Sequence, residues 1–169
     1  MKIIGCLLIL LSGYSFSIEL IKPIKTRITQ LNDLCKGLEI MIAELSSRPC
    51  TMEELACIVS DKCSGQTKRF FHELSSSIVH LGEKSFFDIW SECVSINFKK
   101  FSSMQLDLIR TLGNMLGVYE LSEQLKAIQL CLDSMRIELN QEKDNYPTSK
   151  KLCFACPMSI SAMLIVVLL

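Results

Sequence analysis

Residues 21–45 read IKPIKTRITQLNDLCKGLEIMIAEL, and apolar side chains recur in this stretch every three or four residues. An α-helix has about 3.6 residues per turn, so residues at this spacing share one face and form a heptad seam. Such a face must pack against other helices. The stretch therefore predicts a long amphipathic helix within an all-helical fold. The recurring positions are Ile21, Ile24, Ile28, Leu31, Cys35, Leu38, Ile42 and Leu45.

The middle of the chain holds five further segments of this kind. Thr51–Glu54 is a capping-box sequence that predicts a helix start, and Ser102 or Ser103 caps a later helix. Gly65 and Gly82 mark helix ends. No segment alternates with a two-residue period, so we expect no sheet and an antiparallel bundle of about six helices. The apolar positions are Met52, Leu55 and Val59; Phe71, Leu74, Ile78 and Leu81; Phe86, Ile89, Trp90, Cys93 and Ile96; Leu108, Leu112 and Met115; and Leu121, Leu125, Ile128, Leu132, Met135 and Leu139.

Both ends of the chain are apolar. Residues 3–18 and residues 152–169 contain no charged side chain, and a transmembrane helix needs about 20 mostly apolar residues. Asn145–Pro147 is expected to interrupt the last helix, because proline lacks an amide hydrogen. The sequence thus predicts an N-terminal transmembrane helix (1–21), a helical bundle (22–151) and a C-terminal transmembrane helix (152–169).

Basic residues near the two apolar runs predict the orientation of the chain. Only Lys2 precedes the first run, and none follows the second. Lys and Arg collect on the cytoplasmic side, so we expect a two-pass membrane protein with its central bundle in the cytoplasm. The basic residues between the runs that lie near them are Lys22, Lys25, Arg27, Lys36, Arg136, Lys143, Lys150 and Lys151.

A second interpretation of the two ends remains open. Lys2, the apolar residues 3–11 and Ser15–Ser17 also fit a cleavable signal peptide. The tail would then be a lipid-anchor signal. On this interpretation the protein is a secreted helical-bundle ligand with a membrane-anchored tail.

Composition and motifs exclude several classes of function. The chain has 18 basic and 18 acidic residues and no net charge, whereas nucleic-acid-binding proteins carry a basic face. The nine cysteines have an irregular spacing that does not indicate a disulfide framework. Cys153–Cys156 is a CxxC without a second ligand pair, and His72 and His80 match no metal motif. We therefore expect no catalytic, metal or cofactor site and no small-molecule substrate; a membrane-bound enzyme would need a polar cluster that is not visible here.

One corner of the bundle is less generic than the rest. Glycine inside a helix costs about 1 kcal/mol relative to alanine, so Gly113 indicates a close approach of two helices. Gly117 fits the position after a helix end, and Glu120 or Ser122 then starts the next helix. The corner is either a tight interhelical turn or a surface that binds a partner. Its candidate residues are Leu112, Gly113, Leu116, Gly117 and Gln124.

This layout resembles the stage III sporulation protein AB family of endospore-forming bacteria, over nearly the whole chain. The Leu112–Gly117 stretch with Gln124–Lys126 is the most specific part of the resemblance. The other matching features are Gly5 in the first apolar run, Arg27–Leu31, Leu38–Ile40, Pro49, Thr51–Leu55 and Phe87–Trp90.

The chain departs from the family pattern at two places. Glu120 stands where the family usually has aspartate, which would move the helix cap to Ser122. Pro147 and Pro157, with no glycine in the tail, predict looser packing of the second apolar run.

The resemblance implies a function. The family is similar to the inner-membrane platform protein of type II secretion systems, a bundle of six helices. It would act without catalysis, as a platform in the secretion-like complex between mother cell and forespore. Its implied partners are the membrane, the cytoplasmic ATPase and the other membrane proteins of the stage III sporulation complex. Its implied location is the mother-cell membrane facing the forespore.

Overall fold

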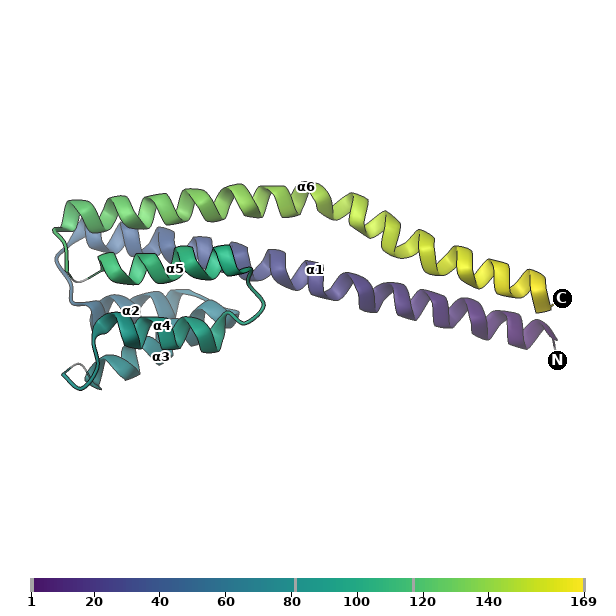
Figure 1. Cartoon of the computed structure of the whole chain (residues 1–169), viewed down its shortest axis with the longest axis horizontal. Helices are drawn as coiled ribbons and strands as arrows, with labels where there is room; N and C mark the ends of the chain where they lie inside the picture. Colours follow the sequence, from purple (N-terminus) through teal and green to yellow (C-terminus); the bar gives the residue numbers. More distant parts are fainter. Residues whose placement is uncertain (1, 81, 117, 169) are drawn as a thin grey trace. The chain divides into compact units, whose positions relative to one another are not determined.

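The computed structural model describes residues 2–80, 82–116 and 118–168, with the side chains of 2–10, 80, 162 and 164–168 left out. Six α-helices and one short 3-10 helix, η1, make up this part of the chain, and it contains no strand. The all-α prediction is confirmed (Figure 1). The helices are α1 (Lys2–Ser47), α2 (Met52–Lys62), α3 (Gly65–Ser77), η1 (Ile78–His80), α4 (Phe86–Asn97), α5 (Ser103–Met115) and α6 (Leu121–Leu168).

Side chains before the helices fix where α2 and α5 begin. The Thr51 hydroxyl accepts a hydrogen bond from the amide of Glu54 at 3.2 Å, and the Glu54 carboxylate accepts one from the amide of Thr51. Ser102 and Gln105 form the same reciprocal pair at the start of α5. The capping box predicted at Thr51 is confirmed, and of the two serines considered for α5, Ser102 is the cap.

Two predicted helix boundaries need correction, the end of α3 and the start of α6. The helix predicted to run as far as Gly82 is α-helical only to Ser77 and continues as the 3-10 helix η1. α6 begins directly after Glu120, whose carbonyl accepts from the amides of Glu123 and Gln124 at 2.9 and 3.0 Å. The cap therefore does not move to Ser122, which lies inside the helix.

The predicted interruption at Asn145–Pro147 is wrong. α6 continues through Pro147 and Pro157, as α1 continues through Pro23. A proline removes one hydrogen bond and conflicts with the carbonyl four residues earlier, which bends a helix without necessarily ending it. Helix on both sides of each proline makes the single missing bond tolerable.

The chain divides into two compact units, and α1 and α6 contribute to both. We call Thr29–Leu139 the body, and Met1–Ile28 with Asn140–Leu169 the terminal helix pair. The domain limits predicted from the apolar runs stay a prediction.

The body is built around the faces that the sequence seams predicted. α2 packs on α3, α3 on α4, and α4 on α5. Phe70 lies at the centre of an aromatic cluster, with ring centroids 4.8 Å from Phe71, 5.0 Å from Trp90 and 5.2 Å from Phe98. The heptad seam of α1 supplies much of the remaining core, and α6 supplies the rest. These buried residues are Leu31, Cys35, Leu38 and Leu45 from α1 and Ile128, Leu132, Met135 and Leu139 from α6.

Small side chains hold the terminal helix pair together. A Cβ added at Gly13 would lie 2.3 Å from the hydroxyl of Ser161, so the two helices approach closely there. Ser17 and Ser161 are buried, and their hydroxyls donate to the carbonyls of Gly13 and Pro157, both at 2.8 Å. Packing at Ser161 is close, because the glycine that permits the approach lies on α1; the looser packing expected for the rest of the tail stays a prediction.

No helix in the described part of the chain contains a stretch long and apolar enough to cross a membrane. The expected transmembrane helices at 1–21 and 152–169 include residues 1–10, 162 and 164–169, whose side chains lie outside the described set.

Candidate functional site

Gly113 lies where α5 meets α4. A Cβ at this position would lie 2.2 Å from Cδ1 of Trp90, a contact that no side chain tolerates. The indole of Trp90 is buried and its Nε1 donates to the carbonyl of Ile109 at 2.7 Å. Gly113 therefore makes room for the indole of Trp90, which belongs to α4. The indole is hydrogen-bonded to Ile109, one turn before Gly113 on α5. The close approach expected at Gly113 is present.

The other candidate residues of the corner do not form one site. Leu112 and Leu116 are buried in the body. Gln124 is half-buried, and its side-chain amide donates to the carbonyl of Tyr119 at 2.7 Å, which closes the turn between α5 and α6. Gly117 lies outside the described residues. Leu112, Gly113 and Leu116 thus serve the core, and a role of this corner in partner binding stays a prediction.

A groove that the sequence interpretation missed lies between α5 and α6, on the outside of the body. It encloses about 540 Å³ and is lined mainly by apolar side chains. Of the four predicted candidates that the structure describes, only Leu112 lines it. We call this surface the α5/α6 groove. Its lining residues are Leu108, Thr111, Leu112, Met115, Tyr119, Glu123, Lys126, Ala127, Leu130, Cys131 and Ser134.

A sequence signal for this groove exists. α6 carries a second stripe with the spacing 3-4-3, beside the seam that enters the core. Its members are Ala127, Leu130, Ser134 and Ile137. Sequence reasoning passed over the stripe because alanine and serine alternate with the two large apolar residues. It also placed Leu108 and Met115 in the apolar stripe of α5 with Leu112, whereas both are only half-buried and line the groove.

Two polar contacts link α4 to its neighbours in the body. Lys84, Glu92 and Glu73 line a hollow between α3 and α4. The Lys84 ammonium pairs with Glu92 at 2.7 Å, and Glu73 accepts from the amide of Asn97 at 2.6 Å. Within the described residues no group of His, Cys, Asp and Glu is placed to hold a metal ion. Cys153 is half-buried on α6 and Cys156 is exposed. The expected lack of a metal site stays a prediction.

Two core thiols are poorly suited to act as nucleophiles. Burial raises the pKa of Cys131 to about 12, and the neighbouring Cys35 adds to the shift. Burial also raises the pKa of Cys93 to about 11, with Glu73 as the next cause. The reactive form of a cysteine is the thiolate, so both side chains remain protonated at neutral pH and pack as small apolar groups.

These observations define a class of protein: a helical-bundle scaffold with an apolar groove on its body and a close-packed helix pair formed by its termini. The family model of stage III sporulation protein AB matches residues 2–169. The chain belongs to the stage III sporulation protein AB family, as the resemblance in its sequence predicted.

Comparison with solved structures supports the fold. A structure of stage III sporulation protein AB (SpoIIIAB) superposes with a TM-score of 0.61 at 16% sequence identity. The match covers 69% of this chain and 93% of the solved chain. At this identity the likeness shows a shared fold. No curated protein matches the chain in sequence.

Proposed function

We propose that this protein is a non-enzymatic platform of the stage III sporulation complex. The terminal helix pair anchors it in the mother-cell membrane facing the forespore, as a two-pass protein, and the body docks the cytoplasmic ATPase of the complex. Membership of the family supports a role in sporulation. The membrane and the ATPase are inferred from the apolar ends of the chain and from the family resemblance.

The arrangement of side chains on the terminal helix pair carries the proposal. Its interface holds the small residues Gly13, Ser17 and Ser161. Its outer surface presents large apolar side chains, each more than half exposed: Leu11, Phe16, Ile160 and Met163. In water, a helix pair buries its large apolar residues. Small residues inside and large apolar residues outside are typical of helices that associate within a lipid bilayer.

The orientation follows from the charges beside the pair. The Arg27 guanidinium pairs with Glu142 at 3.1 Å, where α1 and α6 leave the apolar region. Basic residues gather on this side of both apolar runs, which favours a cytoplasmic body.

Topology is testable with tags on the two ends of the full-length chain. We expect both termini to be protected from a membrane-impermeant protease added to the cytoplasmic side, while a tag inserted after Glu83, in the loop before α4, is cleaved. A terminus that is cleaved from the cytoplasmic side would contradict the two-pass topology.

The docking step is testable by co-purification. The full-length protein, extracted in mild detergent from sporulating cells, should retain the ATPase of the stage III complex. A preparation that retains the other membrane proteins of the complex but never the ATPase would contradict the docking role.

A further inference from the structure

We propose that a hollow on the terminal part of α6 binds one anionic phospholipid. The charged headgroup lies beside two lysines, and an acyl chain lies along the apolar side chains that follow them. The inference rests on the proposed anchoring of the terminal helix pair in a bilayer, and it adds the class of lipid and the residues that select it. We call this surface the α6 hollow. Its lining residues are Pro147, Lys150, Lys151, Phe154, Ala155 and Met158.

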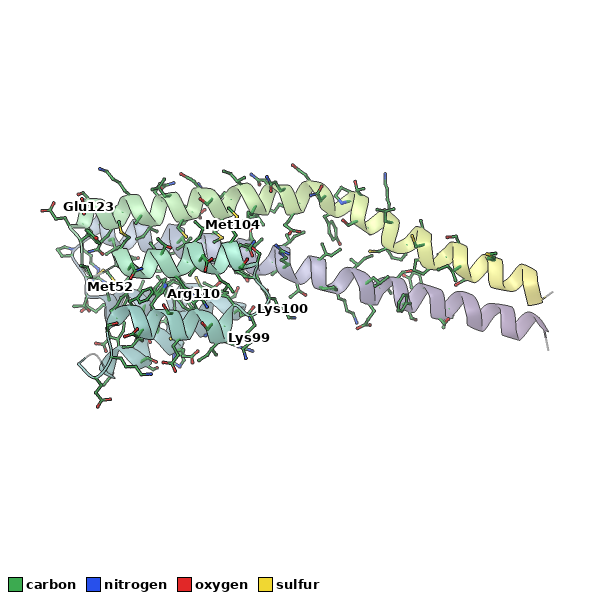
Figure 2. All side chains as sticks on the ribbon, in the orientation of Figure 1. Met52, Lys99, Lys100, Met104, Arg110 and Glu123 are labelled. Atoms are coloured by element: carbon green, nitrogen blue, oxygen red, sulfur yellow. The ribbon has the colours of Figure 1, made fainter. Side chains whose placement is uncertain are left out.

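The α6 hollow lies on a single face of one helix. It encloses about 620 Å³, and its lining residues all belong to the terminal part of α6, which is yellow-green to yellow in Figure 2. Their spacing of three and four positions places them together along the helix. Sites for small solutes usually enclose the ligand from several sides. A hollow bordered by one helix instead suits a molecule that already lies alongside that helix, as a lipid does.

The chemistry of the lining changes along the helix axis. Lys150 and Lys151 form a polar end, and the residues after them form an apolar end. From Lys151 to Met158 the helix rises about 10 Å at roughly 1.5 Å per residue. The ring centroid of Phe154 lies 6.0 Å from that of Tyr14 on α1, so the packing of the helix pair supports one wall of the hollow. The two ends match the headgroup and the acyl chain of a phospholipid.

The two lysines are available to a ligand. Both are exposed, and neither forms an ion pair or a side-chain hydrogen bond with another described residue. The apolar stem of a lysine can lie along an apolar surface while its ammonium group reaches the level of the lipid headgroups. The lysines can therefore contact a headgroup while the rest of the lipid lies against the apolar end.

Acidic side chains do not neutralise this polar end. No acidic residue follows Asp144 in the sequence. Asp144 lies seven positions before Lys151, about 10 Å along the helix, a separation at which salt screens exposed charges. Glu142 is already paired with Arg27 at 3.1 Å. The hollow therefore carries a positive charge that a ligand can balance.

This charge selects the class of lipid. Two ammonium groups attract a headgroup with a net negative charge, whereas a zwitterionic headgroup brings an ammonium group of its own. Basic pockets beside membrane-spanning helices bind anionic headgroups for this reason. The α6 hollow thus favours a lipid such as phosphatidylglycerol over phosphatidylcholine.

Tryptophan fluorescence of the full-length protein in phosphatidylcholine vesicles tests this inference. The chain has one tryptophan, Trp90, which is buried in the body and supplies a constant background. A second tryptophan is introduced as Met158→Trp in the hollow, or as Phe16→Trp at an exposed position of α1 outside it. A small fraction of the lipid is then replaced by phosphatidylglycerol or phosphatidylcholine with brominated acyl chains, which quench a neighbouring indole.

We expect a lipid preference at position 158 alone. Brominated phosphatidylglycerol should quench Met158→Trp more strongly than brominated phosphatidylcholine does. The difference should correspond to a roughly tenfold preference, the order expected for two lysines at a bilayer surface. The two lipids should quench Phe16→Trp equally, because that position faces lipid without selecting it.

Further variants of Met158→Trp separate the hollow from a general effect of charge. K150Q combined with K151Q should remove the preference. The matched control is K25Q with K143Q, which removes the same charge from two exposed lysines of the terminal helix pair outside the hollow and should retain it. A155F fills the hollow without changing its charge and should also lower the preference.

The outcomes separate this inference from the proposed function. Equal quenching by the two lipids at position 158, with quenching at position 16 intact, would overturn the inference and leave the anchoring in place. Equal loss of preference in the two lysine double variants would also overturn it, because any basic surface would then act in the same way. Absence of quenching at both positions would contradict the anchoring itself, and the inference with it.

Discussion

At the scale of single residues, Gly113 and Trp90 show how one small side chain sets the distance between two helices. Glycine is unfavourable in the middle of a helix, and that cost was the sequence signal. The structure supplies the reason, since the indole ring occupies the space of a Cβ. Sequence reasoning could identify Gly113 but could not name Trp90, because helical periodicity does not say which face of α4 meets which face of α5.

Replacing Gly113 tests this contact. We expect Gly113→Leu to lower the free energy of unfolding by roughly 1–3 kcal/mol, because overpacking displaces the indole and its hydrogen bond to Ile109. Thermal denaturation measures the change, with Asn114→Leu as the control at a neighbouring exposed position. An unchanged melting temperature for Gly113→Leu would show that the close approach is absent.

The buried thiols predict an alkaline limit to stability. The pKa of Cys131 in the folded protein, about 12, exceeds the ordinary value of 9.0. The unfolded state therefore loses the thiol proton first as the pH rises, so stability is complete below pH 9 and declines above it. Denaturant titrations between pH 7 and pH 10.5 should show this decline, and Cys131→Ala should make it shallower. Equal slopes in the two proteins would contradict the assignment.

At the scale of elements, the sequence predicted the helices well because each carries its own signals. The start of α2 and the seams of α1 and α6 follow from local hydrogen bonding and from a face that must be buried. The ends were less predictable. Pro147 was interpreted as a stop, yet helix on both sides carries α6 through it. The rule that proline stops a helix considers the one hydrogen bond that proline removes. It does not consider the backbone hydrogen bonds that the rest of α6 retains.

The cap of α5 offers a comparison between two adjacent serines. Ser102→Ala removes the acceptor for the amide of Gln105, and we expect a loss of about 1 kcal/mol in stability. Ser103→Ala changes an exposed residue of the first turn and should leave stability within about 0.5 kcal/mol of the parent. Chemical denaturation distinguishes the two. Equal effects of the two substitutions would mean that the capping hydrogen bond contributes little.

The α5/α6 groove was missed because sequence patterns describe each helix by itself. A sequence shows which residues of a helix could be buried, but the number of helices that cover its faces is decided by the assembly of the body. Leu130 and Ile137 have the character of core residues and remain exposed. Faces that a fold leaves uncovered become visible only when every neighbour is in place.

At the scale of the whole molecule, the chain combines two units that differ in what they bury. The body has a buried core of large apolar residues, centred on Phe70 and Trp90, although some large apolar side chains such as Leu130 and Ile137 remain exposed on it. The terminal helix pair has small residues inside and large apolar residues outside. The family model covers both units, so both belong to a sporulation protein. The contrast between the units is the physical basis for assigning anchoring to one and docking to the other.

Anchoring of the terminal helix pair in a lipid bilayer is the proposal on which the rest of the function depends. Alkaline carbonate extraction of membranes from sporulating cells tests it most directly, because it releases peripheral proteins and leaves integral ones in place. We expect the full-length protein to stay in the membrane pellet. Recovery of the intact, full-length chain in the carbonate supernatant would contradict it.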